Sequence, residues 1–340
     1  MPAKAKKWNL LANYVDKTLI RNKVALKVSN LFEMKWTPTC KPVYLMLNGE
    51  YKGSYDICDN VEVAENRVEL SKMTSKNAEE PEITGGYLLE ADGWAPTLED
   101  IYYNSTQGAV YIIKYPDEDD IIPAQINYIT NFFNEAEGEA YNNIVDKFDL
   151  ESFCKYILIE DLCGNGETFW SVNMQKERNE NKISFGPVWD YDLAFDNDDR
   201  VHPVLERKNF LCKWGTTAGT MQVLGLKILS NEKTIEELKK IWEKYKNKVT
   251  PEILNKFVDE QSEIIEQSQK LNFIRWDILN KLIIVNPVAR GSHKAEVDYL
   301  KEFIPKKYDI LDVIVKIANS TFINEKIEKK TNYSKGSHYD

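Results

Sequence analysis

The residues best suited to chemistry lie in one acidic loop. Five aspartates fall between positions 190 and 199, and the first two, Asp190 and Asp192, follow an apolar run that ends at Trp189. If that run continues as a strand, residues two apart face the same side. Neighbouring carboxylates repel each other unless one is protonated or a cation lies between them, and hard divalent cations prefer oxygen ligands. The pair therefore indicates either a metal site or a solvated acidic turn.

Further candidates precede this loop. A helical segment that stops at Gly164 leads to Glu167, and a short β-like stretch follows with Ser171 and Asn173. This arrangement presents polar groups, but a helix that simply ends at a glycine explains it equally well. Lys114 ends another β run. A lysine in that place is usually a solvent-facing edge residue, and a phosphate-pairing role is the less common alternative. On these residues alone, both interpretations of each candidate stay open.

Common catalytic and binding motifs are missing. The chain has no phosphate-binding loop of the G-x-x-x-x-G-K-[ST] type, no G-x-G-x-x-G, no G-x-S-x-G and no H-E-x-x-H. An EF-hand counted from Asp190 fails, because its sixth position is Phe195 and its twelfth is Val201. The five cysteines form no C-x-x-C pair and are interpreted as small buried residues, with one disulfide as the alternative. Three scattered histidines make a histidine metal centre improbable.

Composition limits the class of protein. The chain has 340 residues, 43% of them hydrophobic and 29% charged, which is typical of a globular protein. A net charge of −10 argues against nucleic acid as a partner, because phosphates would meet a like charge. No apolar run approaches the roughly 20 residues that a membrane-spanning helix needs. The aliphatic run at 282–285 is expected to be a buried strand or helical turn, and no secretory signal is visible.

The elements that must position the candidates change type along the chain. We expect a helix over 8–31, followed by a β-rich part in which Asn48-Gly49 turns a hairpin between strands at 43–47 and 51–57. Further strands are expected at 67–70, 85–90 and 109–113. This part is typical of an α+β fold with an antiparallel sheet.

The later part of the chain has helical periodicity. Helices are predicted over 123–133 and from an N-cap at Asp149, separated by a β-like stretch at 170–192 from further helices. Thr234 is expected to open a capping box and Thr250-Pro251 another helix, and the last helix, 297–304, should stop at Pro305. The tail beyond about 324 is Lys-rich and expected to be loose.

Seven motifs together make a more specific pattern than any one of them. In order they are KWxLLANY (7–14), DKxLIRN (16–22), LNGEYxGxY (47–55), NRV (66–68), GGYLLE (85–90), IKYP (113–116) and PVWDYDxAF (187–195). Over about residues 7–310 the chain resembles the CotH family, first named for a spore coat protein and regarded as atypical, secreted-type protein kinases.

The resemblance implies a two-lobed, protein-kinase-like fold of the α+β class. Residues 1–135 would form a mixed α/β N-terminal lobe with an antiparallel sheet, 136–325 a mostly helical C-terminal lobe with the metal loop, and 326–340 a loose tail. The N-terminal lobe would be incomplete at its start, since an upstream strand of the family is not found in this sequence. A secreted or cell-surface location, in a bacterium, is also implied.

The resemblance implies transfer of the γ-phosphoryl group of ATP, with Mg²⁺ or Mn²⁺, to Ser or Thr of a protein partner. Asp190 would be a catalytic metal ligand supported by Asp192, and Glu167 would orient or deprotonate the acceptor. Lys114, Ser171 and Asn173 would bind the nucleotide and its metal. Positioning and charge neutralisation carry such a reaction.

Three departures from the family pattern keep two other functions open. Glu167 stands where the family commonly has Asp, Ser171 near its usual Asn, and Asp196 at its usual Gly. The chain could therefore be a catalytically degenerate module that binds a glycan or a protein surface. A structural protein stabilised by calcium at residues 190–199 is the third hypothesis.

Overall fold

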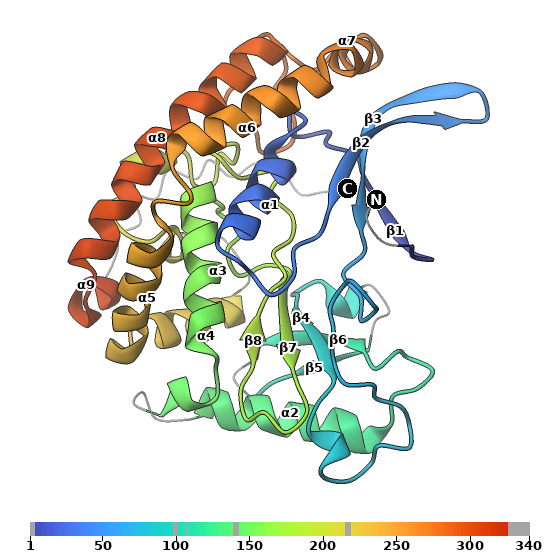
Figure 1. Cartoon of the computed structure of the whole chain (residues 1–340), viewed down its shortest axis with the longest axis vertical. Coiled ribbons are helices and arrows are strands. Elements are labelled where there is room, and N and C mark those ends of the chain that lie inside the picture. Colours follow the sequence, from blue (N-terminus) through green and yellow to red (C-terminus); the bar gives the residue numbers. More distant parts are fainter. Residues whose placement is uncertain (1–3, 98–100, 107, 139–142, 215–218, 326–340) are drawn as a thin grey trace.

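The structure, a computed structural model, describes residues 4–97, 101–106, 108–138, 143–214 and 219–325 (Figure 1). It is a mixed α+β fold, as expected. The strands are β1 (Trp8–Leu11), β2 (Cys40–Leu47), β3 (Glu50–Asp59), β4 (Tyr87–Ala91), β5 (Tyr102–Asn104), β6 (Val110–Tyr115), β7 (Val172–Lys176) and β8 (Ser184–Phe185). The helices are α1 (Arg21–Leu31), α2 (Pro123–Gly138), α3 (Leu150–Cys163), α4 (Gly219–Leu229), α5 (Glu232–Tyr245), α6 (Pro251–Ile264), α7 (Glu266–Arg275), α8 (His293–Ile317) and α9 (Ser320–Asn324).

A three-stranded antiparallel sheet of order β1-β3-β2 carries the predicted hairpin at Asn48-Gly49, which projects from the body of the molecule in Figure 1. The prediction of one helix over 8–31 is wrong in its first part, because Trp8 begins a strand paired with β3. The Asp16 carboxylate accepts the backbone N–H groups of Thr18 and Arg21, which stabilises a turn before α1. Helical spacing of apolar residues does not distinguish such a turn from a longer helix.

A disulfide joins Cys40 and Cys58, which are direct partners across β2 and β3 with their Cα atoms 4.2 Å apart. The prediction that all five cysteines are simply buried thiols is therefore wrong for this pair, and its alternative of one disulfide is confirmed. Cross-strand pairing brought the two residues together, and their separation of 18 positions gave no sign of it. The other three cysteines are free and buried.

The hairpin is attached to the helical part at a glycine of the LNGEYxGxY motif. Gly53 has a φ of +127°, and a Cβ there would lie 2.8 Å from Trp276 Nε1 and 2.9 Å from Asn272 Oδ1. Trp276 Nε1 donates to the carbonyl of Lys52 at 2.8 Å, and the Ser54 N–H donates to Asn272 Oδ1 at 2.9 Å. A side chain at position 53 would break this docking, because both space and backbone conformation exclude it.

The second sheet has the order β5-β6-β4-β7-β8, with antiparallel pairing throughout. One face is apolar and packs against α2, where the rings of Tyr111 and Phe133 lie 4.3 Å apart between centroids. Alternation along β4 and β7 places Glu90 and Asn173 on the opposite face, directly across from each other. The sheet therefore has the apolar core on one face and a row of polar side chains on the other, which is called the polar row below and includes Glu90 and Asn173.

Helix α3 is buried along most of its length and packs against α5 and α8 in the helical part of the molecule (Figure 1). Its predicted N-cap is confirmed, since the Asp149 side chain accepts the N–H of Glu151. Gly164 has left-handed backbone dihedrals and ends the helix as predicted. Near that end the buried Lys307 of α8 contacts Asp161 at 2.5 Å between Nζ and Oδ1. This ion pair ties α8 to the segment that leads into the candidate loop.

Several predicted elements differ from the structure. No strand forms at 67–70, where only an isolated bridge between Val63 and Val68 occurs. The cap of α5 is Asn231 instead of Thr234, whereas Thr250 caps α6 as predicted. Helix α8 continues through Pro305 because its apolar face is buried on both sides of that residue. Tertiary burial outweighs the local cost of the proline.

The run at 282–285 is also not buried as expected. Leu282 and Ile284 are each 63% exposed and lie in a loop. The predicted loose tail at 326–340 lies outside the described residues. Among the described helices, none is both long and apolar enough to span a bilayer.

Candidate functional site

Three polar side chains from neighbouring strands meet on the open face of the five-stranded sheet. Lys114 Nζ of β6 lies 2.9 Å from Glu90 Oε2 of β4 and 3.3 Å from Asn173 Oδ1 of β7. All three are wholly or partly buried. The expectation that Lys114 faces solvent is therefore wrong, because β6 is an internal strand and the ammonium group has two partners. The structure brings together two predicted residues and adds Glu90.

Asp190 and Asp192 lie in the irregular segment after β8, where a turn brings their side chains together. Asp190 has a φ of +63°, so the strand alternation that we expected for this pair does not occur. The carboxyl groups of Asp190 and Asp192 lie close enough that each changes the pKa of the other. Between them, the Tyr191 N–H donates to Asn22 Oδ1 at 2.7 Å. The prediction that Asp190 and Asp192 lie close together is correct, but a turn brings them together instead of strand alternation.

The pKa values of both aspartates are raised above the ordinary carboxyl range. Desolvation is the largest cause for each. For Asp190 the next is the negative charge of Glu167, and Glu90 adds to it. For Asp192 it is the charge of Asp190, followed by Asp16 and Glu167. The polar row and the acidic turn therefore lie within electrostatic reach of each other, and the turn has a high affinity for protons.

Glu167 follows α3 in the loop that the sequence singled out. Its carboxylate lies 2.6 Å from Arg200 Nη2, and Arg200 Nε lies 2.8 Å from Asp198 Oδ1. Arg200, which follows the acidic loop, thus holds the carboxylate of Glu167, the residue predicted to orient the acceptor hydroxyl. Sequence reasoning missed Arg200: its place directly after the acidic loop draws attention to it, but nothing in the sequence pairs it with Glu167.

Ser171 joins this loop to β7 and is half-buried, with a φ of +47°. Its carbonyl accepts from Asn173 Nδ2 at 3.5 Å. A non-glycine residue in the left-handed region costs about 1 kcal/mol or more and is enriched at functional sites. Two predicted site residues, Ser171 and Asp190, share this conformation.

A buried glutamate connects the two loops of the site. Glu160 of α3 accepts from Tyr191 Oη at 2.5 Å and from Asn165 Nδ2 at 2.8 Å. Burial raises its pKa to about 8, against the lowering effect of hydrogen bonds from Tyr191, Asn165 and Tyr156. This carboxyl therefore stays protonated near neutrality. Sequence reasoning noted the segment but assigned Glu160 no role, because its partners are set by tertiary packing.

The later aspartates of the acidic loop are bound to protein groups. Asp196 accepts the N–H of Val204 at 2.7 Å and contacts Tyr299, and Asp198 accepts from Arg200. Across the residues that the structure describes, no group of three or more His, Cys, Asp or Glu side chains is arranged to hold a metal. The geometry therefore gives no support to a calcium cage formed by residues 190–199. Two adjacent carboxylates remain as potential metal ligands.

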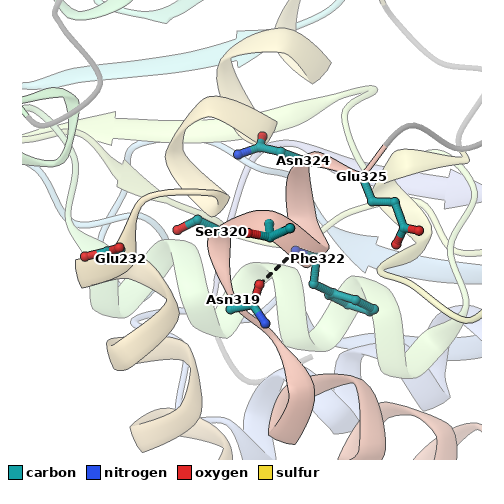
Figure 2. A pocket seen from close by; sticks show the side chains of 7 residues that line it. Glu232, Asn319, Ser320, Phe322, Asn324 and Glu325 are labelled. Carbon is teal, nitrogen blue, oxygen red and sulfur yellow. Dashed lines mark hydrogen bonds between the residues drawn. The ribbon is translucent and has the colours of Figure 1, made fainter.

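Two surface cavities differ in whether candidate site residues line them. One of about 840 Å³ lies between α9 and the start of α5 and is lined by Glu232, Phe322 and neighbours of Phe322 (Figure 2). It includes none of the candidate site residues. A second, of about 570 Å³, has Lys114 in its wall and so adjoins the polar row.

Comparison with known families decides the identity at family level. The sequence model of a family described as "CotH kinase protein" matches residues 2–311 of the 340. The chain belongs to the CotH family. A comparison with curated proteins finds no match. The resemblance drawn from the seven motifs is thereby confirmed, and a kinase-related function follows at the level of the CotH family.

The CotH motifs converge in the structure. GGYLLE ends at Glu90, IKYP contains Lys114, and PVWDYDxAF contains the acidic pair, so three distant motifs supply one site. The Arg67 side chain of the NRV motif is buried and contacts Asp59, Glu62 and the carbonyl of Lys7. That motif therefore organises the segment around the cavity beside Lys114.

Proposed function

We propose that this CotH-family protein transfers the γ-phosphoryl group of ATP to a Ser or Thr hydroxyl of a protein partner, with Mg²⁺ or Mn²⁺. The observation that carries the proposal is the meeting of Lys114, Glu90 and Asn173 within electrostatic reach of the Asp190–Asp192 pair. Protein kinases use a lysine–glutamate ion pair, a metal-binding aspartate and a metal-binding asparagine for this reaction. The same residue types occur together here.

The acidic pair fits a divalent cation by the nature of its donors. Asp190 reaches the surface on one side, while the surrounding protein atoms desolvate its carboxyl group and that of Asp192. Two carboxylates this close cannot both be charged without compensation, which a shared proton or a cation supplies. Magnesium typically binds one or two carboxylates together with substrate phosphates, so a pair suffices. Asp190 and Asp192 would hold the cation, with the Asn173 amide oxygen nearby. When bound, it would neutralise phosphate charge.

Lys114 and Glu167 have separate roles in this proposal. The ammonium group of Lys114 is positioned by Glu90 and would pair with phosphate oxygens. Glu167 would orient the acceptor hydroxyl and accept its proton, while Arg200 holds the carboxylate in place. Ser171 would set the position of the loop that carries Glu167 relative to Asn173. Catalysis by this group would depend on positioning more than on covalent chemistry.

We also propose that the protein works outside the reducing cytoplasm. The support is the Cys40–Cys58 disulfide, since disulfides persist mainly in secreted, periplasmic or surface proteins. A secreted or surface kinase would find its acceptor protein there.

Phosphate transfer from labelled ATP tests the function. The protein is incubated with Mg²⁺ or Mn²⁺ and with mixed Ser/Thr-containing proteins, beside Asp190→Asn and the control Asp199→Asn. Asp199 is an exposed residue of the same loop whose N–H bonds the Val285 carbonyl. We expect transfer by the wild type and the control and a loss of at least 100-fold in Asp190→Asn. Absence of any transfer, including to the protein itself, contradicts the proposal.

A non-catalytic binding module is the second candidate. It is favoured by the ion pair between Glu167 and Arg200, which occupies the carboxylate that the reaction would use. The two functions separate in a thermal-shift assay combined with the transfer assay. A metal-dependent rise of the melting temperature with ATP, together with no transfer to any acceptor, would identify a module that binds nucleotide without catalysis.

A further inference from the structure

Two tryptophan rings stack on each other at the surface beside the candidate site. Trp94 follows β4 and Trp170 precedes β7, and their ring centroids lie 6.1 Å apart with the ring planes inclined by 11°. Trp94 is 61% exposed. The eight tryptophans all lie in the described part of the chain, and the others are buried or partly buried. Trp94 therefore presents to solvent a large ring of the type that often anchors a binding partner.

The five-stranded sheet places this pair at the end of the polar row. Glu90 of β4 lies across from Asn173 of β7, and the ladder between these two strands ends with the next pair of residues. Trp94 lies in the segment that leaves β4 at this end, and Trp170 lies in the segment that enters β7 there. The Trp170 N–H donates to the carbonyl of Glu167 at 3.0 Å. The stacked rings thus adjoin the loop that carries the proposed acceptor-orienting residue.

Local contacts hold the two rings in place. The Trp94 N–H donates to Asp92 Oδ1 at 2.8 Å, and the Trp94 carbonyl accepts from the N–H of Thr97 at 2.8 Å and from its hydroxyl at 2.7 Å. A Cβ at Gly93 would lie 3.0 Å from the ring of Trp170, so the backbone passes directly against that ring. The exposed ring is therefore supported on one side and needs little ordering when it binds a partner.

The charge around the stacked rings is predominantly negative. Glu90 and Glu167 each have a cationic partner, and the charges of both act on Asp190. Among the described residues, no lysine or arginine forms an ion pair with Asp190 or Asp192. Binding of Mg²⁺ together with ATP would not reverse this sign, because the triphosphate carries more charge than the cation. The surroundings therefore attract a cationic group.

An exposed indole face in an acidic environment suits a guanidinium group. Arginine is planar and weakly hydrated, so it stacks on aromatic rings more readily than the compact ammonium group of lysine. The chain itself contains three such contacts, in which an arginine lies 4.6 to 4.8 Å from the ring of another tryptophan. No cation of the described residues lies over Trp94. A neutral sugar ring also stacks on indole, but it gains nothing from the negative charge.

We propose that Trp94 and Trp170 form a docking subsite that binds an arginine side chain of the acceptor protein, near in sequence to the Ser or Thr that receives the phosphoryl group. The inference rests on the proposed function and adds to it the residues that select the acceptor. The guanidinium group stacks on the exposed face of Trp94. No bond is made or broken there, so both tryptophans set specificity and neither is a catalytic residue.

Synthetic peptides test the inference on the full chain with Mg²⁺. Each peptide has one central Ser among Ala and Gly residues, with a single Arg, Lys or Gln placed at each flanking position in turn. Transfer from labelled ATP gives kcat and KM, and calorimetric titration gives the affinity for the same peptides. The variants are Trp94→Ala and the conservative Trp94→Phe, and the control is Tyr44→Ala, which removes an exposed aromatic ring from the β2–β3 hairpin.

We expect the wild type to have its lowest KM for Arg at one or two positions, with Lys and Gln weaker there. Trp94→Ala should raise KM for that Arg peptide roughly tenfold, as for the loss of a desolvated cation–ring contact, with little change in kcat. The KM for the Gln peptide should stay the same, which a general structural defect would not allow. Trp94→Phe should keep most of the preference for Arg, and Tyr44→Ala should match the wild type.

A wild type that does not distinguish Arg from Gln, or a preference for Arg that persists in Trp94→Ala, overturns the inference and leaves the proposed function standing. A glucan oligosaccharide that binds through Trp94 more tightly than any Arg peptide also overturns it, because the subsite would then belong to a glycan. If the wild type transfers phosphate to no acceptor but binds Arg peptides through Trp94 in the titration, the proposed function fails and the arginine subsite stands.

Discussion

Replacing Glu160 by Gln should change how the stability of the protein depends on pH. The carboxyl is 2% exposed, and burial raises its pKa from 4.5 to about 8. The folded state therefore keeps this proton over a pH range in which the unfolded chain releases it. Since the folded state binds more protons there, its stability falls as pH rises from about 4.5 to about 8 and is level above that.

The size of the effect follows from the difference between the two pKa values. With a tenfold change in a protonation equilibrium worth about 1.4 kcal/mol, moving from pH 5 to pH 8 should remove about 3 kcal/mol of the free energy of unfolding. The Glu160 side chain is too little exposed for solvent to screen this effect. Gln at position 160 has no proton to lose, and it can still accept from Asn165 and donate to the hydroxyl oxygen of Tyr191.

Guanidinium denaturation of wild type and variant at pH 5 and pH 8 measures this. Between pH 5 and pH 8, the free energy of unfolding of Glu160→Gln relative to that of the wild type should rise by about 3 kcal/mol. The control is Glu236→Gln, an exposed glutamate of α5, whose difference from wild type should stay constant. A change smaller than about 1 kcal/mol for Glu160→Gln would refute the reasoning, because it would mean that the buried carboxyl is charged at neutral pH.

Three further changes probe the contacts that support the site. Gly53→Ala should lower stability by about 1–3 kcal/mol, and Gly49→Ala by less, because a Cβ at position 49 meets no atom within 4 Å; urea denaturation compares the two. Cys40→Ser with Cys58→Ser should cost about 3 kcal/mol for a closed loop of this length, and equal denaturation midpoints with and without the disulfide would contradict this. Lys307→Met should cost about 3–5 kcal/mol because it leaves a buried carboxylate on α3 unpaired, and a loss below about 1 kcal/mol would show that the pair is dispensable.

Local sequence signals predicted the elements that depend on local chemistry. The Asn48-Gly49 hairpin, the Asp149 and Thr250 caps and the Gly164 stop agree with the structure, because each involves residues only a few positions apart. Predictions failed where distant contacts decide the conformation. Helix α8 continues through Pro305 because it is buried against other elements, and β1 is a strand because β3 pairs with it.

The candidate site divides in the same way. Asp190 and Asp192 were found by their spacing, but a left-handed turn brings their carboxyl groups together. Seven short motifs in order identified the CotH family, which the family comparison confirmed. Neither the spacing nor the motifs predicted Glu90 as the partner of Lys114 or Arg200 as the partner of Glu167, because no signal in a single sequence pairs residues across a sheet or between loops.

The sequence by itself thus determined the family, the α+β class, the hairpin, the helix caps and the acidic turn. Each depends on residue type and on short-range geometry along the chain. Only the tertiary structure decided that Lys114, Glu90 and Asn173 form one polar row, that Glu160 joins both loops, and that Arg67 joins the segment before β1 to the segment after β3. Strand order and burial set these contacts, because they bring together side chains that the sequence separates by tens of residues.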